Sequence, residues 1–550
     1  MFIRNNKARR VALVAAALSL LSVAIQQPSA QTPAAPKLLV IVVVDQLRFD
    51  YLDRYKSLWT AGLKRLTTEA AVFERAYYPY LNTVTCSGHA TIGTGALPAT
   101  HGVIMNEWWQ RGQKRRMSCT DDPAIVSVPY GSGAAERIGH SAHRLRVPTL
   151  ADRLRASTPD SRVVALSMKP RSTVMLAGHA GTAVTWFADS NTWATSSAFA
   201  AQPVAPVQAF VTANPVERDS NVTWDRMLDP ARYTGVDAGI GERGPAGWNA
   251  LFPHPLQGSG SGNRFFDLWE RSPFSDVYLG KMAAQLVRDY QLGQRDVVDF
   301  LGVSFSALDY VGHDFGPNSH EVQDTLARLD RTLGDLFTAL DATVGRDRYV
   351  VGLSADHGVA DIPEANTAAG RDAGRVLNAD IRRVGEDAMT AAHGVGPHIA
   401  HVEYTNVYLT DAARGRAAAS PAYLAPLVRA LSATPGVQRV FPSAGLEARR
   451  MSSDPIERAA ALSHFPGESG EVVVVLKPNW IGTDTSTTTH GSLQPYDQHV
   501  PVIFMGTAFK PGRYTHPASP ADVAPTLAVL VGLPMPGIDG QVRREALKPR

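Results

Sequence analysis

The stretch 38-LLVIVVV-44, followed by Asp45, decides the fold. A continuous run of mostly β-branched apolar residues is typical of a central strand in a parallel sheet, which is buried on both faces. Similar runs occupy residues 163–168, 297–305 and 349–354. Each is followed by polar or charged residues, which in an open α/β sheet mark the edge where ligands bind. These runs therefore predict both a sheet and the position of a site.

Helical periodicity separates several of these strands. Between 318 and 344, apolar residues recur at steps of four and three, which predicts one amphipathic helix. Alternating strands and helices favour an α/β fold with a mainly parallel central sheet flanked by helices. The stretches 471–476 and 500–505 are further predicted strands. Residues 172–275 and 360–470 lack this regular alternation, and we interpret them as inserted cap or lid segments, the second with a small strand near 402–409.

Composition and charge indicate an ordinary globular protein. The chain has 550 residues, 44% hydrophobic and 19% charged, with a formal charge of +3. Four positive residues, Arg4, Lys7, Arg9 and Arg10, precede an apolar stretch at 11–25, so residues 1–30 read as a signal peptide. An uncleaved anchor helix is the alternative. The rest of the chain, 31–550, is close to neutral and carries no nucleic-acid-binding footprint. We expect an exported protein, periplasmic or secreted, without a membrane span in its mature form.

The chain has two cysteines, Cys86 and Cys119. They either form one bridge in an oxidising compartment or remain buried thiols. We favour free thiols, because Cys86 lies inside the motif discussed next.

Two kinds of chemically active residue stand at or near the strand ends. Candidate metal ligands are Asp45, Asp309, His313, Asp356, His357 and His490. Aspartate and histidine without cysteine suit a catalytic zinc site, and this set is large enough for two metal ions. Individually, Asp309 and His313 fit an ordinary helix-surface pair, and Asp356-His357-Gly358 fits a turn. His499 is a rival for the last ligand, although it leads into a predicted core strand.

A candidate nucleophile lies in the segment 83-TVTCSGHAT-91, which precedes a predicted helix. A hydroxyl at a helix N-terminus, bound to a divalent metal, is a plausible nucleophile. Thr85, Cys86 and Ser87 are all candidates, and a simple helix cap is the ordinary alternative.

Six motifs in the same order make the chain resemble the alkaline phosphatase superfamily. They are VVVDQLRFDYL (42–52), TVTCSGHATIGTGALPATHGVIMNEWW (83–109), SMKPR (167–171), SALDYVGHDFGP (306–317), LSADHGV (353–359) and TTTHGSLQPYDQHVPVIFMG (487–506). Within the superfamily, the chain is similar to the PafA-like, Sphingomonas-type bacterial alkaline phosphatases that use a single threonine.

The resemblance implies an alkaline-phosphatase-like α/β sandwich and assigns residue roles. Thr85 matches the nucleophile. Asp45, Asp356 and His357 match the ligands of one zinc, and Asp309, His313 and His490 those of a second, so two Zn²⁺ per subunit are expected. Asn106, Lys169 and Arg171 match the residues that hold the phosphate oxygens. The relatives also suggest a monomer.

The implied function is hydrolysis of small-molecule phosphate monoesters through a phosphothreonine intermediate. The Lys169-x-Arg171 pair distinguishes such monoesterases from related nucleotide pyrophosphatase/phosphodiesterases. Cys86 lacks the proline and arginine of the C-x-P-x-R sulfatase signature, which argues against a sulfatase. A phosphodiesterase or phosphonate hydrolase with the same zinc pair, and a non-catalytic phosphate- or metal-binding relative, are the alternatives.

Overall fold

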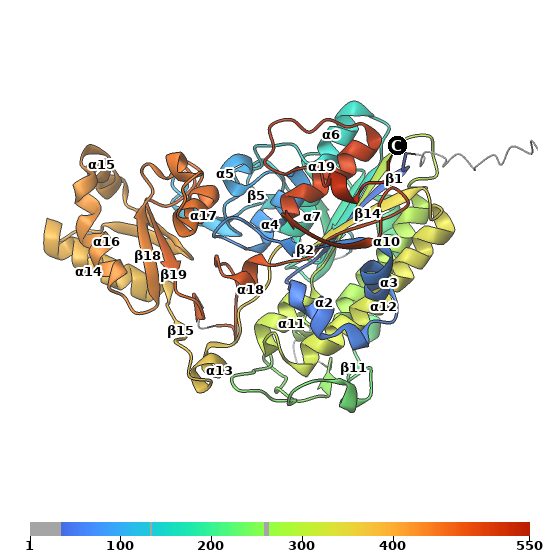
Figure 1. Ribbon diagram of the computed structural model, residues 1–550, viewed down its shortest axis with the longest axis horizontal. Helices are drawn as coiled ribbons and strands as arrows, with labels where there is room; N and C mark the ends of the chain where they lie inside the picture. Colours follow the sequence, from blue (N-terminus) through green and yellow to red (C-terminus); the bar gives the residue numbers. More distant parts are fainter. Residues whose placement is uncertain (1–34, 132–134, 258–262, 484, 550) are drawn as a thin grey trace, which may run out of the picture. The chain divides into compact units, whose positions relative to one another are not determined.

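The computed structural model describes residues 35–131, 135–257, 263–483 and 485–549 (Figure 1). The predicted signal peptide lies outside the described residues. Among the helices within these ranges, none is both long and apolar enough to cross a membrane.

A 10-stranded sheet forms the centre of the fold, in the order β22-β2-β21-β14-β1-β13-β8-β9-β10-β6. The run quoted above is β1 (Leu38–Val44), and all of its residues are buried. It pairs in parallel with β13 (Asp299–Phe305) and β14 (Tyr349–Ser354). β8 (Val163–Ser167) continues the parallel part beside β13. The four strongest strand predictions and the mainly parallel centre are therefore confirmed.

Both edges of the sheet contain antiparallel pairs. β21 (Val502–Met505) runs antiparallel to β14 and to β2 (Ala71–Ala76), while β22 (Gly512–Ala518) is parallel to β2. At the other edge, β9 (Ala183–Ala188) is followed by antiparallel β10 (Thr192–Ser196) and β6 (Ser127–Pro129). β9 and β10 lie within 172–275, the range predicted as an insertion, yet they belong to the main sheet.

Helices cover both faces of this sheet, because successive strand side chains point to opposite sides. Val40, Val42 and Val44 share a buried apolar cluster with α3 (Gly62–Glu69), α10 (Pro273–Asp289) and α12 (His320–Thr343). Leu39, Ile41 and Val43 share another with α4 (Thr85–Thr94), α6 (Leu150–Ser157), α7 (Pro170–Ala177) and α19 (Val523–Ala528). Figure 1 shows these helix layers on either side of β1 and β14. The amphipathic helix predicted for 318–344 is α12.

Residues 374–481 contain a second, smaller sheet with its own apolar core. Its order is β16 (Ile399–Glu403), β17 (Asn406–Leu409), β19 (Val472–Leu476) and β18 (Val437–Pro442), all antiparallel. α14 (Asn378–His393) and α16 (Ala425–Ser432) contribute to the same core. The strand predicted at 471–476 belongs to this sheet, and the single strand predicted near 402–409 is a hairpin.

The two cysteines form a disulfide, so the preference for free thiols was wrong. β3 (Glu107–Gln110) and β4 (Arg115–Ser118) form a hairpin that returns Cys119 to the start of α4, and the Cα atoms of Cys86 and Cys119 lie 6.7 Å apart. The hairpin register brings together residues separated by 33 positions. Local sequence around Cys86 carries no sign of this contact.

Shorter elements complete the described chain. They include α2 (Phe49–Arg54), α8 (Ala205–Ala213), α9 (Asn263–Glu270), α11 (Ala307–Phe315), α13 (Pro363–Ala368), α15 (Asp411–Ala419), α17 (Pro455–Ser463) and α18 (Pro495–Gln498), with the paired strands β15 (Gly374–Arg375) and β20 (Trp480–Ile481).

Candidate metal centre and active site

The predicted ligands meet at the carboxyl edge of the central parallel strands. Asp45 directly follows β1, and Asp356-His357 follows β14. β13 leads into α11, which carries Asp309 and His313 one turn apart and therefore on one face. His490 comes from the loop between β20 and α18. Parallel strands that end together thus deliver side chains distant in sequence to one place.

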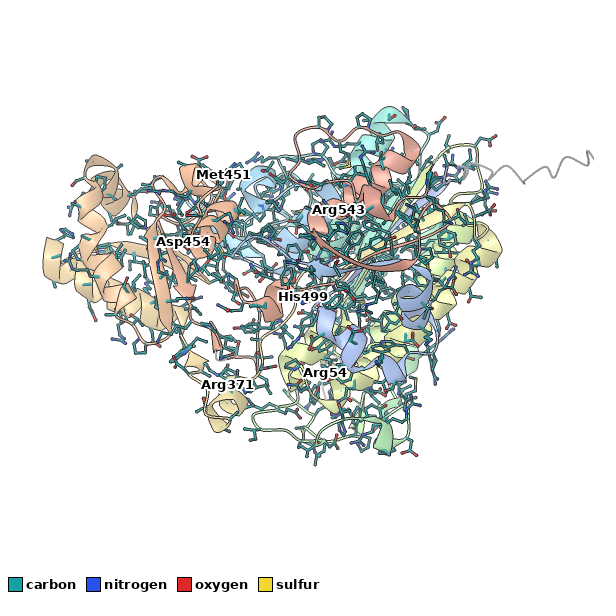
Figure 2. The ribbon with its side chains drawn as sticks, in the orientation of Figure 1. Arg54, Arg371, Met451, Asp454, His499 and Arg543 are labelled. Atoms are coloured by element: carbon teal, nitrogen blue, oxygen red, sulfur yellow. A yellow bond between two sulfur atoms is a disulfide. The ribbon has the colours of Figure 1, made fainter. Side chains whose placement is uncertain are left out.

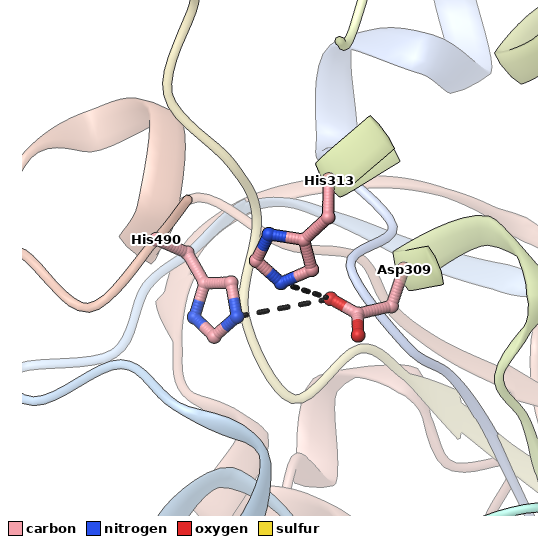
Figure 3. Close-up of side chains that lie close together, drawn as sticks. All are labelled: Asp309, His313 and His490. Atoms are coloured by element: carbon pink, nitrogen blue, oxygen red, sulfur yellow. Dashed lines mark ion pairs between the residues drawn. The ribbon is translucent and has the colours of Figure 1, made fainter. Parts of the chain in front are cut away.

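Asp309, His313 and His490 form one potential metal site (Figure 3). Nε2 of His313 lies 3.3 Å from Oδ1 of Asp309, and Nε2 of His490 lies 3.7 Å from the same oxygen. Ligand atoms of all three residues lie within 4.8 Å of one another. The structure therefore brings together the three residues that resemblance assigned to one zinc.

Asp45, Asp309 and His357 form a second potential site that shares Asp309 with the first. Nε2 of His357 lies 3.4 Å from Oδ1 of Asp45 and 3.4 Å from Oδ2 of Asp356. These two carboxylate oxygens are buried and accept no hydrogen bond from the residues described. Apart from the 3.3 Å contact between Nδ1 of His89 and Oδ2 of Asp356, no donor lies against these oxygens in the described chain, and buried carboxylate oxygens without hydrogen bonds suit a bound cation.

All three histidines present Nε2 to the carboxylates. Nδ1 of His313, His357 and His490 faces a backbone carbonyl at 2.8–2.9 Å, from Thr488, Gly358 and Thr83 respectively. A backbone acceptor at Nδ1 places the proton there and leaves Nε2 free as a ligand. Burial lowers the pKa of His490 well below its ordinary value, and His357 and His313 lower it further. A neutral imidazole is the form that binds metal.

Gln46 connects the two groups of carboxylates and was missed by sequence reasoning. Its backbone N–H donates to Oδ1 of Asp356 at 3.1 Å, and its side-chain amide donates to Oδ1 of Asp309 at 2.7 Å. Gln46 has a positive φ of 69°. A Cβ on Gly312 would overlap the Gln46 side chain, so glycine leaves room for this contact. Adjacency to Asp45 was the only sequence signal.

Lys169 lies among the carboxylates in this structure. Its buried ammonium donates to Oδ2 of Asp45 at 2.6 Å and to Oδ2 of Asp309 at 2.5 Å. Burial alone would lower the pKa of Lys169, but Asp309 and Asp45 overcome this effect and raise it. Lys169 therefore balances the negative charge of one carboxylate from each ligand set. Its contact with phosphate oxygens stays a prediction.

Thr85 is the candidate nucleophile that faces these clusters. It is the first residue of α4, and its Oγ1 lies 3.4 Å from Nε2 of His357. The N-cap position belongs to Val84, which makes no side-chain capping bond, so Thr85 is not a simple cap. Ser87 instead donates to the backbone carbonyl of Asn82. Cys86 is held in the disulfide.

A cavity of about 360 Å³ opens beside Thr85. Its lining includes Asn106, Arg171, Arg271, Asp309, Tyr310, His313, Glu403, Tyr404 and His490. Within the described chain, the Arg171 guanidinium makes no hydrogen bond or ion pair, and its Nε is buried. Asn106 accepts a 2.7 Å hydrogen bond from the backbone N–H of Cys86 through Oδ1, which leaves its NH₂ group as the end available to a ligand. Glu403, the last residue of β16, and Tyr404, in the turn that follows, were not predicted.

Two further histidines, His499 and His89, lie near or outside the candidate ligand sets. His499, which is labelled in Figure 2, stacks against the rings of Phe49 and Tyr77. Its Nε2 contacts the carbonyl of Glu74 at 2.8 Å, so His499 does not compete with His490 as a ligand. His89 contacts Oδ2 of Asp356 at 3.3 Å, which supports the orientation of that carboxylate.

A family model described as "Type I phosphodiesterase / nucleotide pyrophosphatase" matches residues 39–499. Alkaline phosphatase PhoV of Synechococcus elongatus is 31% identical, with 95% of each chain covered. Alkaline phosphatase PhoK of a Sphingomonas species is 32% identical, over 93% of this chain and 91% of PhoK. The crystal structure of alkaline phosphatase PafA superposes with a TM-score of 0.86 at 30% identity, over 94% of this chain and 100% of PafA. The α/β fold predicted from sequence is confirmed by this match.

Proposed function

The chain belongs to the type I phosphodiesterase/nucleotide pyrophosphatase family of the alkaline phosphatase superfamily, and from this membership we propose that it is a zinc-dependent alkaline phosphatase. Its substrates are small-molecule phosphate monoesters, and its products are an alcohol and inorganic phosphate. The observation that carries this proposal is the cavity in which Thr85, Asn106 and Arg171 lie beside two clusters of metal-type ligands.

The donor set fits two zinc ions. Asp45, Asp356 and His357 would hold one ion, and Asp309, His313 and His490 the other. This fit is supported by the oxygens of Asp45 and Asp356 that accept no hydrogen bond and by the Nε2 atoms that face the carboxylates. Zinc ions bound there would supply Lewis-acid stabilisation of the attacking and leaving oxygens.

The chain's own residues perform the group transfer. Oγ1 of Thr85 attacks phosphorus, the ester oxygen leaves as the alcohol, and a phosphothreonine forms. Water then cleaves this ester, which releases phosphate and restores the hydroxyl. Thr85 suits this step because α4 begins at it, and the positive end of a helix dipole favours an incoming anion even though the Cys86 N–H is already bonded to Asn106.

Arg171 and Asn106 provide the preference for monoesters. A monoester dianion has three non-bridging oxygens, so it can accept hydrogen bonds from the unpaired guanidinium and from the Asn106 NH₂ group. A diester replaces one of those oxygens with an alkoxy group and carries one charge less. Lys169 adds a buried positive charge next to both ligand sets.

The test is the ratio of kcat/KM for an aryl phosphate monoester to that for the matching diester, on purified zinc-loaded protein. We expect a large preference for the monoester. A preference for the diester would replace this proposal with the phosphodiesterase function that the family description also contains. Phosphate binding without turnover would favour a non-catalytic relative.

We also propose that residues 1–30 direct export to the periplasm or the medium. Residues 31–550 then form the catalytic domain, with cap segments within 172–275 and 360–470. The enzyme is proposed to be a monomer. The contribution of Glu403 and Tyr404 to the cavity supports a cap function for the second segment. Export is tested by N-terminal sequencing of protein recovered from outside the cytoplasm. Oligomeric state is tested by sedimentation of the purified enzyme.

A further inference from the structure

The start of α4 is fixed by contacts from outside the helix. Its N-cap residue, Val84, makes no side-chain capping bond. The backbone N–H of Cys86, in the first turn, donates instead to Oδ1 of Asn106, 20 positions further along the chain. Asn106 therefore fulfils for α4 the role that a capping side chain normally fulfils from the N-cap position.

Asn106 is itself held by the other half of the disulfide. Glu107 pairs with Ser118 at the open end of the β3–β4 hairpin. Asn106 precedes Glu107 and Cys119 follows Ser118, so these two residues lie opposite each other just outside the hairpin. The backbone N–H of Cys119 donates to the Asn106 carbonyl at 2.8 Å. Cys119 is in turn bonded to Cys86.

These contacts close a ring through three residues. It runs from Cys86 through the disulfide to Cys119, by a hydrogen bond to the Asn106 backbone, and by the Asn106 side chain back to Cys86. Both cysteines are fully buried. The ring fixes both the backbone carbonyl and the side-chain amide of Asn106 relative to Thr85, which precedes Cys86. Because Oδ1 is engaged, the orientation of the NH₂ group in the cavity is fixed as well.

We propose that the Cys86–Cys119 disulfide is a positioning element for Asn106 and thereby sets how well the active site holds the transferred phosphoryl group. This inference rests on the proposed function, in which Asn106 contacts a phosphoryl oxygen. Without the covalent bond, the hairpin is connected to α4 at this point only through hydrogen bonds, and the Asn106 amide loses its fixed distance to Thr85. Positional errors of about 1 Å in such groups reduce rates by about 100-fold.

A double-mutant cycle tests this inference. Wild type, Cys119→Ala, Asn106→Ala and the double variant are loaded with zinc, and kcat/KM for an aryl phosphate monoester is measured for each. We expect Cys119→Ala to lower kcat/KM by about 10-fold to 100-fold in the wild-type background. In the Asn106→Ala background, the same change should have little further effect, because the group that it positions is already gone.

Three outcomes separate the possibilities. Equal fold losses in both backgrounds would show general stabilisation of the fold and overturn the inference. An unchanged kcat/KM in a folded Cys119→Ala variant would also overturn it. An inactive wild-type enzyme would contradict the proposed function instead, and the inference would fall with it.

A second measurement applies if the variants that carry Cys119→Ala do not fold. The chain has only two cysteines, so a count of free thiols reports directly on this bond. The wild-type enzyme is treated with a phosphine reductant, and activity is compared with the number of thiols released while circular dichroism monitors the fold. Activity should fall in proportion to thiol release for wild type and remain constant for Asn106→Ala; equal proportional losses would contradict the inference.

Discussion

Replacing Arg171 with alanine should reduce hydrolysis of phosphate monoesters much more than hydrolysis of diesters. The guanidinium lines the cavity next to Thr85 and forms no hydrogen bond or ion pair with the residues described, so its donors are available to substrate. A charge-assisted hydrogen bond contributes about 1.5 to 3 kcal/mol. A forked contact with two monoester oxygens therefore contributes about 3 to 6 kcal/mol, or about 10² to 10⁴ in kcat/KM.

A diester retains fewer charged oxygens for this fork. If one of the two hydrogen bonds remains, the loss for the diester is about 1.5 to 3 kcal/mol, or about 10-fold to 100-fold. The ratio of monoester to diester activity should thus fall by about 10-fold to 100-fold. The assay is steady-state hydrolysis of an aryl monoester and its methyl diester by zinc-loaded wild type and Arg171→Ala.

Arg271→Ala is the matched comparison. Arg271 lines the same cavity, but its guanidinium is already paired with Asp314 at 2.8 Å, so its loss should change the ratio much less. Equal fold losses on both substrates in Arg171→Ala would refute the reasoning, since they would show that Arg171 does not discriminate by the number of charged oxygens.

Four further changes have distinct expected results. Gln46→Ala should weaken zinc binding by about 10-fold to 100-fold in a chelator competition; unchanged affinity would contradict the bridging role. Chelation should abolish activity and lower the unfolding temperature, and zinc should restore both. Burial raises the pKa of Asp276 from 3.8 to about 7. The native state therefore binds more protons than the unfolded state between these values, and stability falls with rising pH. Relative to Asp276→Asn, wild type should lose about 3 kcal/mol of unfolding free energy from pH 5 to 8, measured by urea unfolding. Cys86→Ala/Cys119→Ala should lower that free energy at fixed pH by about 4 kcal/mol, given the 33-residue separation.

Sequence reasoning succeeded where the signal was local. β1 and β14 have the predicted limits, because buried parallel strands require continuous apolar runs. β9 was missed because AVTWFA is short and lies in a region rich in glycine, proline and tryptophan. The β16–β17 hairpin was predicted as one strand because nothing in the apolar pattern marks its turn at Tyr404, where φ is 47°.

In the site, too, local sequence signals could be read and contacts between distant segments could not. Residues that follow predicted strands, such as Asp45 and His357, could be named from position and chemistry. The disulfide was not recoverable, because it depends on the β3–β4 register and on the return of that hairpin to α4. The contacts of Lys169 and Gln46 were equally hidden, since each depends on where two other carboxylates lie in space.

The wide dispersal of the proposed metal ligands along the chain has a consequence for biogenesis. Asp45 emerges early in synthesis, whereas His490 lies near the far end, and neither can meet its partners until β1, β13 and β14 have paired. Loops of several hundred residues must close first, and closure of such non-local contacts is slow. Filling of the proposed site that contains His490 would therefore be a late event that reports completed assembly. A chain truncated before His490 retains those three strands and the Asp45, Asp356 and His357 set, but it lacks one residue of the other proposed set. Occupancy of that other proposed site would therefore distinguish finished molecules from nearly finished ones.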